Sequence, residues 1–211
     1  MAEELHISQG SKEEKYALLY RQICALVEGE CDDIANMANV AAMIHITFGF
    51  WWTGFYRVIG DELVLGPFQG PLACSRIAFG RGVCGTAWKE GVTQVVPDVE
   101  KFPGHIACSS ESKSEIVVPV KAGGKITAVL DIDSEKLNTF DDTDRVWLEK
   151  IIKTLQKRAS SFLQCLISQY MHSHTRSNGN EKNSHPPCRC HKESTIEKSY
   201  PQKAYRHNLH P

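Results

Sequence analysis

The sequence predicts an α+β domain, in which an antiparallel sheet of about six strands carries the N- and C-terminal helices on one face. Apolar residues recur at helical spacing before residue 50 and again after residue 140. Between these regions the apolar period becomes that of strands, and turn sequences join two pairs of strands into hairpins. Helices that flank a run of strands, rather than alternating with strands, are typical of α+β folds.

Two helices are expected before residue 50. Ser11 and Glu14 form an S-x-x-E capping box that begins the first helix. The segment GECDD interrupts the pattern, and a second helix then runs to about Gly49. Their apolar sides comprise Tyr16, Leu19, Ile23, Leu26 and Val27 in the first helix, and Ile34, Met37, Ala38, Ala41, Ile44 and Phe48 in the second.

Strands dominate the middle of the chain. WWTGFYRVIG and ELVLGPFQ alternate like paired strands around a turn at Gly60 and Asp61, and SEIVVPVKAGGKITAVLDIDSE predicts a second hairpin that turns at residues 122–124. Between the hairpins, several glycines indicate an irregular loop followed by a short helix from Gly82 to Glu90. VTQVVPDV then predicts a strand, and EKFPGHIACSSESKS a long polar connection.

A long amphipathic helix is expected over residues 140–170, with Cys165 on its apolar side. Aliphatic residues nearly vanish after Tyr170, which predicts a disordered, His- and Lys-rich tail over residues 171–211. Residues 1–10 are expected to be flexible, which leaves residues 11–170 as one domain. The spacing of His185, Cys188 and Cys190 fits no structural zinc pattern, so no metal site is expected and the tail is predicted to be dispensable.

Charge and targeting signals exclude several classes of protein. The net charge is −1, with seven Lys/Arg against three Asp/Glu after Tyr170, so the domain itself is acidic and shows no nucleic-acid-binding pattern. The start MAEELHISQG lacks the apolar core of a signal peptide, and no apolar run is long enough to span a membrane. A cytoplasmic protein is expected, in which cysteines serve chemistry more often than structural disulfides.

Cysteines and acids gather between residues 70 and 135. Cys74, Cys84 and Cys108 lie in segments that read as loops or starts of elements rather than core. Glu115 begins one apolar strand, and Asp131 and Asp133 lie within another. Because an unpaired buried charge is costly, carboxylates on buried strands indicate a function. Thiols beside such acids predict a pocket for redox chemistry or acyl transfer.

The acids and two aromatic residues suggest how such a pocket is lined. Asp131 and Asp133 are two residues apart on a strand, so both side chains point to the same face. Mutual repulsion should raise at least one of their pKa values. A protonated carboxyl could then donate to a substrate oxygen, or an ionised one could bind an ammonium group. Trp52 and Tyr56 also share a face, either as core or as the wall of a site for a small amphipathic ligand.

Four segments closely resemble the free methionine-R-sulfoxide reductases, which are single GAF-domain enzymes. They are WTGFYR, GPFQGPLACSRIAFGRGVCGTAW, VPDVEKFPGHIACSSESKSEIVVPV and VLDIDSE. The resemblance covers residues 11–170 and implies a GAF fold and reduction of free L-methionine (R)-sulfoxide. It also implies that Cys108 is the nucleophile and that Cys74 and Cys84 are the resolving thiols, with Cys74 favoured. The substrate-binding positions that it implies are Trp52, Tyr56, Glu115, Asp131 and Asp133.

The same resemblance implies a catalytic cycle and its partners. Attack on the sulfoxide leaves a sulfenic acid, which condenses with a second thiol to a disulfide. Thioredoxin is the implied reductant, with no bound cofactor or metal and with a monomer or homodimer as the assembly. Two alternatives are a GAF module that senses a small ligand and a thiol switch without substrate. A sensor normally adjoins an output domain, and a switch does not require the acids.

Overall fold

The computed structural model describes residues 4–104 and 110–156. One six-stranded antiparallel sheet forms the centre of the fold, in the strand order β3-β2-β1-β6-β5-β4. This confirms the predicted fold class. The strands are β1 (Trp52–Ile59), β2 (Glu62–Gln69), β3 (Arg76–Ala78), β4 (Gln94–Val96), β5 (Ser114–Ala122) and β6 (Lys125–Ser134).

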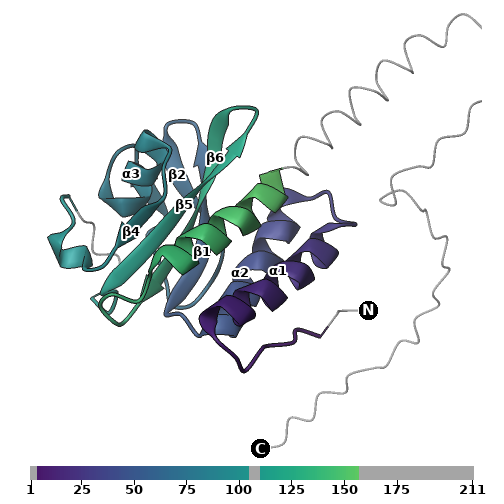
Figure 1. The fold of residues 1–211 in the computed structure, drawn as a ribbon. Coiled ribbons are helices and arrows are strands. Elements are labelled where there is room, and N and C mark those ends of the chain that lie inside the picture. Colours follow the sequence, from purple (N-terminus) through teal and green to yellow (C-terminus); the bar gives the residue numbers. More distant parts are fainter. Residues whose placement is uncertain (1–3, 105–109, 157–211) are drawn as a thin grey trace, which may run out of the picture. The chain divides into compact units, whose positions relative to one another are not determined.

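Helices cover the two faces of the sheet unequally. One face carries α1 (Lys12–Val27), α2 (Asp33–Phe48) and the closing helix, which is described over residues 142–156 (Figure 1). These helices bury a large aliphatic and aromatic cluster against β1, β5 and β6. The short helix α3 (Gly82–Glu90) packs with a second, smaller cluster on the opposite face. The terminal helices thus share one face as expected, and α3 lies on the other.

Local sequence signals account for the ends of these elements. Ser11 and Glu14 form the expected capping box at the start of α1. The β1–β2 hairpin closes through a two-residue turn, since Ile59 pairs with Glu62. In the β5–β6 hairpin both turn residues, Gly123 and Gly124, have positive φ values, a backbone that glycine adopts without strain.

Two parts of the predicted secondary structure were wrong. The segment from residue 92 to 99 was expected to be one strand, but only Gln94–Val96 pairs, along one edge of the sheet. After Pro97 the chain forms a short 3-10 helix, η1 (Val99–Lys101). The stretch predicted as an irregular loop contains β3, which pairs with β2 at the other edge. Three-residue strands carry too little alternation to be recognised from sequence.

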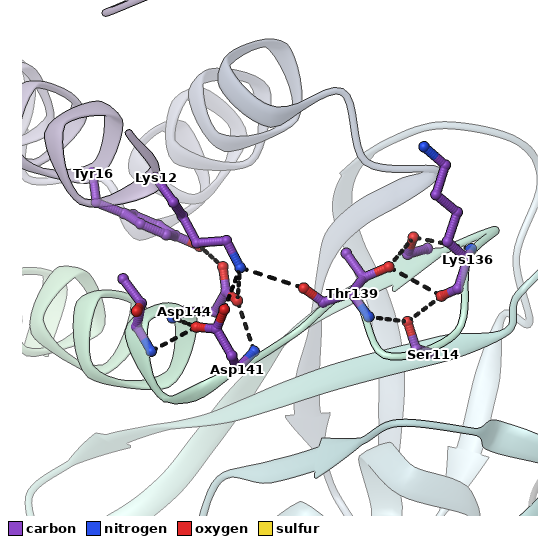
Figure 2. Close-up of polar contacts among 9 residues, drawn as sticks. Lys12, Tyr16, Ser114, Lys136, Thr139, Asp141 and Asp144 are labelled. Carbon is purple, nitrogen blue, oxygen red and sulfur yellow. Dashed lines mark hydrogen bonds and ion pairs between the residues drawn. The ribbon is translucent and has the colours of Figure 1, made fainter. Parts of the chain in front are cut away.

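A polar cluster joins the first helix to the start of the closing helix (Figure 2). The carboxylate of Asp144, almost fully buried, accepts hydrogen bonds from the Tyr16 hydroxyl at 2.8 Å and from Lys12 Nζ at 2.6 Å. Lys12 also pairs with Asp141 at 2.8 Å and thereby lowers the pKa of Asp141 to about 2. A buried carboxylate needs such partners, so this cluster fixes the terminal helices against each other.

Several sequence predictions concern residues outside those described. They include Cys108, the second half of the closing helix with Cys165, and the polar tail with His185, Cys188 and Cys190. Within residues 4–104 and 110–156, no helix is long and apolar enough to cross a membrane.

Candidate active site

A pocket opens on the face of the sheet that carries α3. Its walls come from β1, β5, β6, the start of α3 and the loop between β2 and β3. The volume that the centre of a water molecule can reach is about 60 Å³, which is room for several water-sized groups. Predicted site residues that line it are Trp52, Tyr56, Cys84, Glu115, Asp131 and Asp133.

Strand register brings the three acids together. Asp133 on β6 pairs with Trp52 on one side and with Glu115 on the other. Asp131, two residues earlier, points to the same face, as the sequence predicted. Glu115 and Asp131 are almost fully buried, and the Oδ1 atom of Asp131 has no hydrogen-bond partner among the described residues. The pocket floor therefore contains a buried carboxylate oxygen that no hydrogen bond from the described residues satisfies.

Burial and mutual repulsion keep these acids from ionising easily. Burial, followed by the charges of Asp131 and Asp133, raises the pKa of Glu115 well above its usual value. Burial and the charge of Asp133 do the same to the pKa of Asp131. Burial also raises the pKa of Asp133 to about 6, although a hydrogen bond from the Ser112 hydroxyl opposes this rise. Carboxyl groups that stay protonated near neutral pH can donate a proton. When they ionise, a bound cation stabilises their negative charge.

Cys84 lies on the floor of the pocket rather than in a loop. It belongs to the first turn of α3, as expected for the start of an element, but the prediction that it avoids the core was wrong. Its side chain is 3% exposed, and its thiol donates to Glu115 Oε1 at 3.9 Å. Burial and the charges of Asp131 and Glu115 raise the pKa of this thiol, which therefore stays protonated.

Trp52 and Tyr56 form the aromatic wall of the pocket, while also belonging to the smaller apolar cluster. Their rings stack with centroids 5.8 Å apart, and Trp52 stacks on Phe68 at 5.5 Å. Gly54 makes this arrangement possible, because a Cβ atom there would lie 2.5 Å from the Trp52 ring and closer still to Phe68. Core packing, the first of the two sequence interpretations, is confirmed, and both rings also line the pocket. Contact of these rings with a ligand stays a prediction.

The same two aromatic residues hold the loop that carries Cys74. The indole of Trp52 donates to the Pro71 carbonyl at 3.1 Å, and the Tyr56 hydroxyl donates to the Cys74 carbonyl at 3.0 Å. Burial and the charge of Asp131 raise the pKa of Tyr56, so the phenol remains a donor. Cys74 is disulfide-bonded, whereas Cys84 and the distant Cys24 are not. Cys108, the predicted nucleophile, lies outside the described residues.

Three pocket features were missed in the sequence. Ser112 fixes the Asp133 carboxylate, and Arg81, just before α3, has the only cationic side chain among the described lining residues. Neither carries a recognisable local signal, because each reaches the pocket from a loop. Gly54 did carry one, since a glycine inside a strand often marks a close approach of another group.

Comparison with known proteins identifies the family of the chain. A family model described as GAF domain matches residues 33–155. The chain is 60% identical over 156 residues to GAF domain-containing protein A of Dictyostelium discoideum, covering 74% of this chain and 99% of that protein. It is 45% identical over 148 residues to free methionine-R-sulfoxide reductase of Escherichia coli, covering 70% and 90%.

A solved structure extends the similarity to three dimensions. It is that of free methionine-R-sulfoxide reductase from Neisseria meningitidis in complex with its substrate, which is 52% identical to this chain. The TM-score is 0.74, with 77% of this chain and 98% of that one covered. The chain therefore belongs to the GAF-domain family, among the free methionine-R-sulfoxide reductases.

Proposed function

We propose that the protein reduces free L-methionine (R)-sulfoxide to L-methionine with its own thiols and that thioredoxin recycles it. The observation that carries this proposal is a single pocket in which the aromatic wall of Trp52 and Tyr56 faces Glu115, Asp131 and Asp133. Similarity to reductases of this name supports the substrate. The resemblance of the segment around Cys108 supports the nucleophile, and the pocket chemistry supports the roles of the acids and the aromatic residues.

The proposed substrate matches the two sides of the pocket. Free methionine sulfoxide has an ammonium group at one end and a methyl group on the sulfoxide sulfur at the other. The acids bind the ammonium group through electrostatic attraction. The face of the Trp52 indole packs against the methyl group. A peptide-bound sulfoxide lacks this ammonium, so the free amino acid is the better ligand.

The reaction needs a thiol nucleophile and a proton donor. We assign the nucleophile to Cys108, whose sulfur takes up the sulfoxide oxygen, so that methionine and a cysteine sulfenic acid result. One buried carboxyl, Asp131 or Asp133, polarises the sulfoxide by donating a hydrogen bond to its oxygen. The Cys74 thiol then attacks the sulfenic sulfur, a disulfide forms and water leaves. Thiol–disulfide exchange with the dithiol of thioredoxin supplies two electrons and two protons, which restores both thiols and leaves thioredoxin as the disulfide.

Cys74 is a better resolving residue than Cys84. Cys74 is already disulfide-bonded in the structure, and two hydrogen bonds from the aromatic wall hold its loop. Cys84 is buried, protonated and bonded to Glu115, which makes it a slow nucleophile. We therefore assign Cys84 to the floor of the pocket. The catalytic unit is residues 11–170, and the tail over residues 171–211 has no part in the reaction.

The test is a single-turnover assay of the reduced protein with a racemic mixture of free methionine sulfoxide. Only the R diastereomer should be consumed, and a sulfoxide within a peptide should stay nearly untouched. Cys108→Ser should abolish the burst of methionine, Cys74→Ser should spare it but prevent recycling, and Cys24→Ser should behave like the unmodified protein. A stoichiometric burst from Cys108→Ser would overturn the assignment of the nucleophile.

A further inference from the structure

Three groups at the floor of the pocket are arranged like metal ligands. The Sγ atom of Cys84 and one carboxylate oxygen each from Glu115 and Asp131 all lie within 4.8 Å of one another. The sulfur is 3.9 Å from Glu115 Oε1. Around zinc, with Zn–S near 2.3 Å and Zn–O near 2.0–2.2 Å, neighbouring ligand atoms lie roughly 3.5 Å apart. Shifts of about an ångström would close the three groups around such an ion.

A second observation is that this cluster contains a buried polar atom without a hydrogen-bond partner in the described part of the chain. Asp131 is 6% exposed, yet its Oδ1 atom has no hydrogen-bond partner among the described residues. A buried carboxylate oxygen without a partner is costly. Arg81 supplies the only positive side chain in the described pocket lining, against three carboxylates. Acidic side chains therefore outnumber basic ones in the described pocket lining.

We infer that Cys84, Glu115 and Asp131 form a site for a thiophilic divalent cation, with Zn²⁺ as the fitting ion. One sulfur and two oxygen ligands leave a fourth tetrahedral position open towards the pocket. Mg²⁺ and Ca²⁺ are excluded, because they prefer a shell of oxygen ligands without sulfur. Zn²⁺ displaces the thiol proton of Cys84, which passes to the solvent as the Zn–S bond forms.

Zinc in this site blocks the pocket. Glu115 and Asp131 then serve as its ligands and no longer receive the substrate ammonium, so zinc and methionine compete. This consequence rests on the proposed function, whereas zinc binding itself does not. The zinc site thus overlaps the substrate site, and zinc bound there inhibits substrate binding.

The test is calorimetric titration with Zn²⁺ of the full-length chain in the state that the structure describes, with Cys74 disulfide-bonded and Cys84 free. The chain should carry Cys188→Ser and Cys190→Ser, so that the tail thiols do not bind the metal. One ion should bind per chain, and Cys84→Ser and Asp131→Asn should each weaken binding by at least about tenfold. Cys24→Ser, which removes a thiol outside the pocket, should bind zinc normally. Saturating L-methionine should weaken zinc binding in the otherwise unmodified chain.

Each outcome has a defined meaning. Equal zinc affinity in Cys84→Ser and in the control, with both variants folded by thermal melting, overturns the site. Binding of Mg²⁺ with the same affinity as Zn²⁺ would show that the site does not select thiophilic cations. Zinc binding that saturating L-methionine leaves unchanged overturns the shared pocket even if the point variants misfold. None of these results affects the proposed reduction, which is tested by methionine production without zinc.

Discussion

Alternate residues of β1, β5 and β6 point to opposite faces of one sheet, and the two faces have different chemistry. On the face under α1, α2 and the closing helix, neighbours such as Phe55, Leu130 and Ile132 are fully buried among apolar side chains. On the other face, Asp131 and Glu115 are buried almost as deeply, beside a thiol.

The difference shows how one sheet divides stability and function. The helix-bearing face gains free energy from apolar burial, on the order of 25 cal/mol per Å² removed from water. The acids of the pocket face cost free energy, because these carboxyl groups are buried without paired cations. Adjacent residues on β6 should therefore respond to substitution in opposite ways.

The largest expected effect is the loss of catalysis on the pocket face. Asp131→Asn keeps the shape of the side chain but removes its acidic proton and its charge. The rate of methionine formation should fall by about 10²–10⁴-fold, as is typical for a general acid. Single-turnover kinetics measure this loss, with Asp61→Asn in the exposed β1–β2 turn as the control. A normal rate in Asp131→Asn alone would leave Asp133 as the proton donor, whereas a normal rate with normal apparent affinity in both Asp131→Asn and Asp133→Asn would show that the acids are structural.

The adjacent residue provides the opposite case. Leu130→Ala should lower the free energy of unfolding by about 2–5 kcal/mol, because it leaves a cavity in the larger cluster. Activity per folded molecule should remain unchanged, since the side chain points away from the pocket. Urea unfolding followed by circular dichroism measures the loss. If activity fell as far as in Asp131→Asn, the two faces would not be separable.

Asp133→Asn should raise stability while it impairs function. A folded-state pKa raised to about 6 from 3.8 means that ionisation favours the unfolded chain. The folded state therefore loses stability as pH rises from about 4 through about 6. Removing the carboxyl should raise the free energy of unfolding by about 1–3 kcal/mol above that range.

This gain should disappear below about pH 4, where the carboxyl is protonated in both states. Urea unfolding at several pH values gives the profile. A gain of the same size at every pH would mean that packing, and not ionisation, causes it.

The smallest effect tests the link between the aromatic wall and the Cys74 loop. Tyr56→Phe keeps the ring but removes the hydrogen bond to the Cys74 carbonyl. Such a bond is worth about 0.5–1.5 kcal/mol, so disulfide formation should slow by roughly 2–10-fold and by more than the methionine burst. The matched control is Tyr20→Phe in α1. Equal slowing of both steps would make Tyr56 a substrate contact only.

Local patterns in the sequence were sufficient for most of the fold. The capping box at Ser11, the two hairpin turns and the alternation of β6 depend on residues close together in the chain. For that reason the shared face of Asp131 and Asp133 was also predictable, because a strand sends every second side chain the same way.

The chemistry of the pocket depended on contacts between distant segments. Only the paired strands place Glu115 beside Asp133, and only the packing of α3 buries Cys84 against Glu115. The hydrogen bond from Tyr56 to the loop of Cys74 likewise spans residues far apart in sequence. The sequence by itself thus determined which groups are present and which face each strand residue takes. Tertiary structure decided their burial, and burial sets their pKa values, because desolvation penalises the charged form.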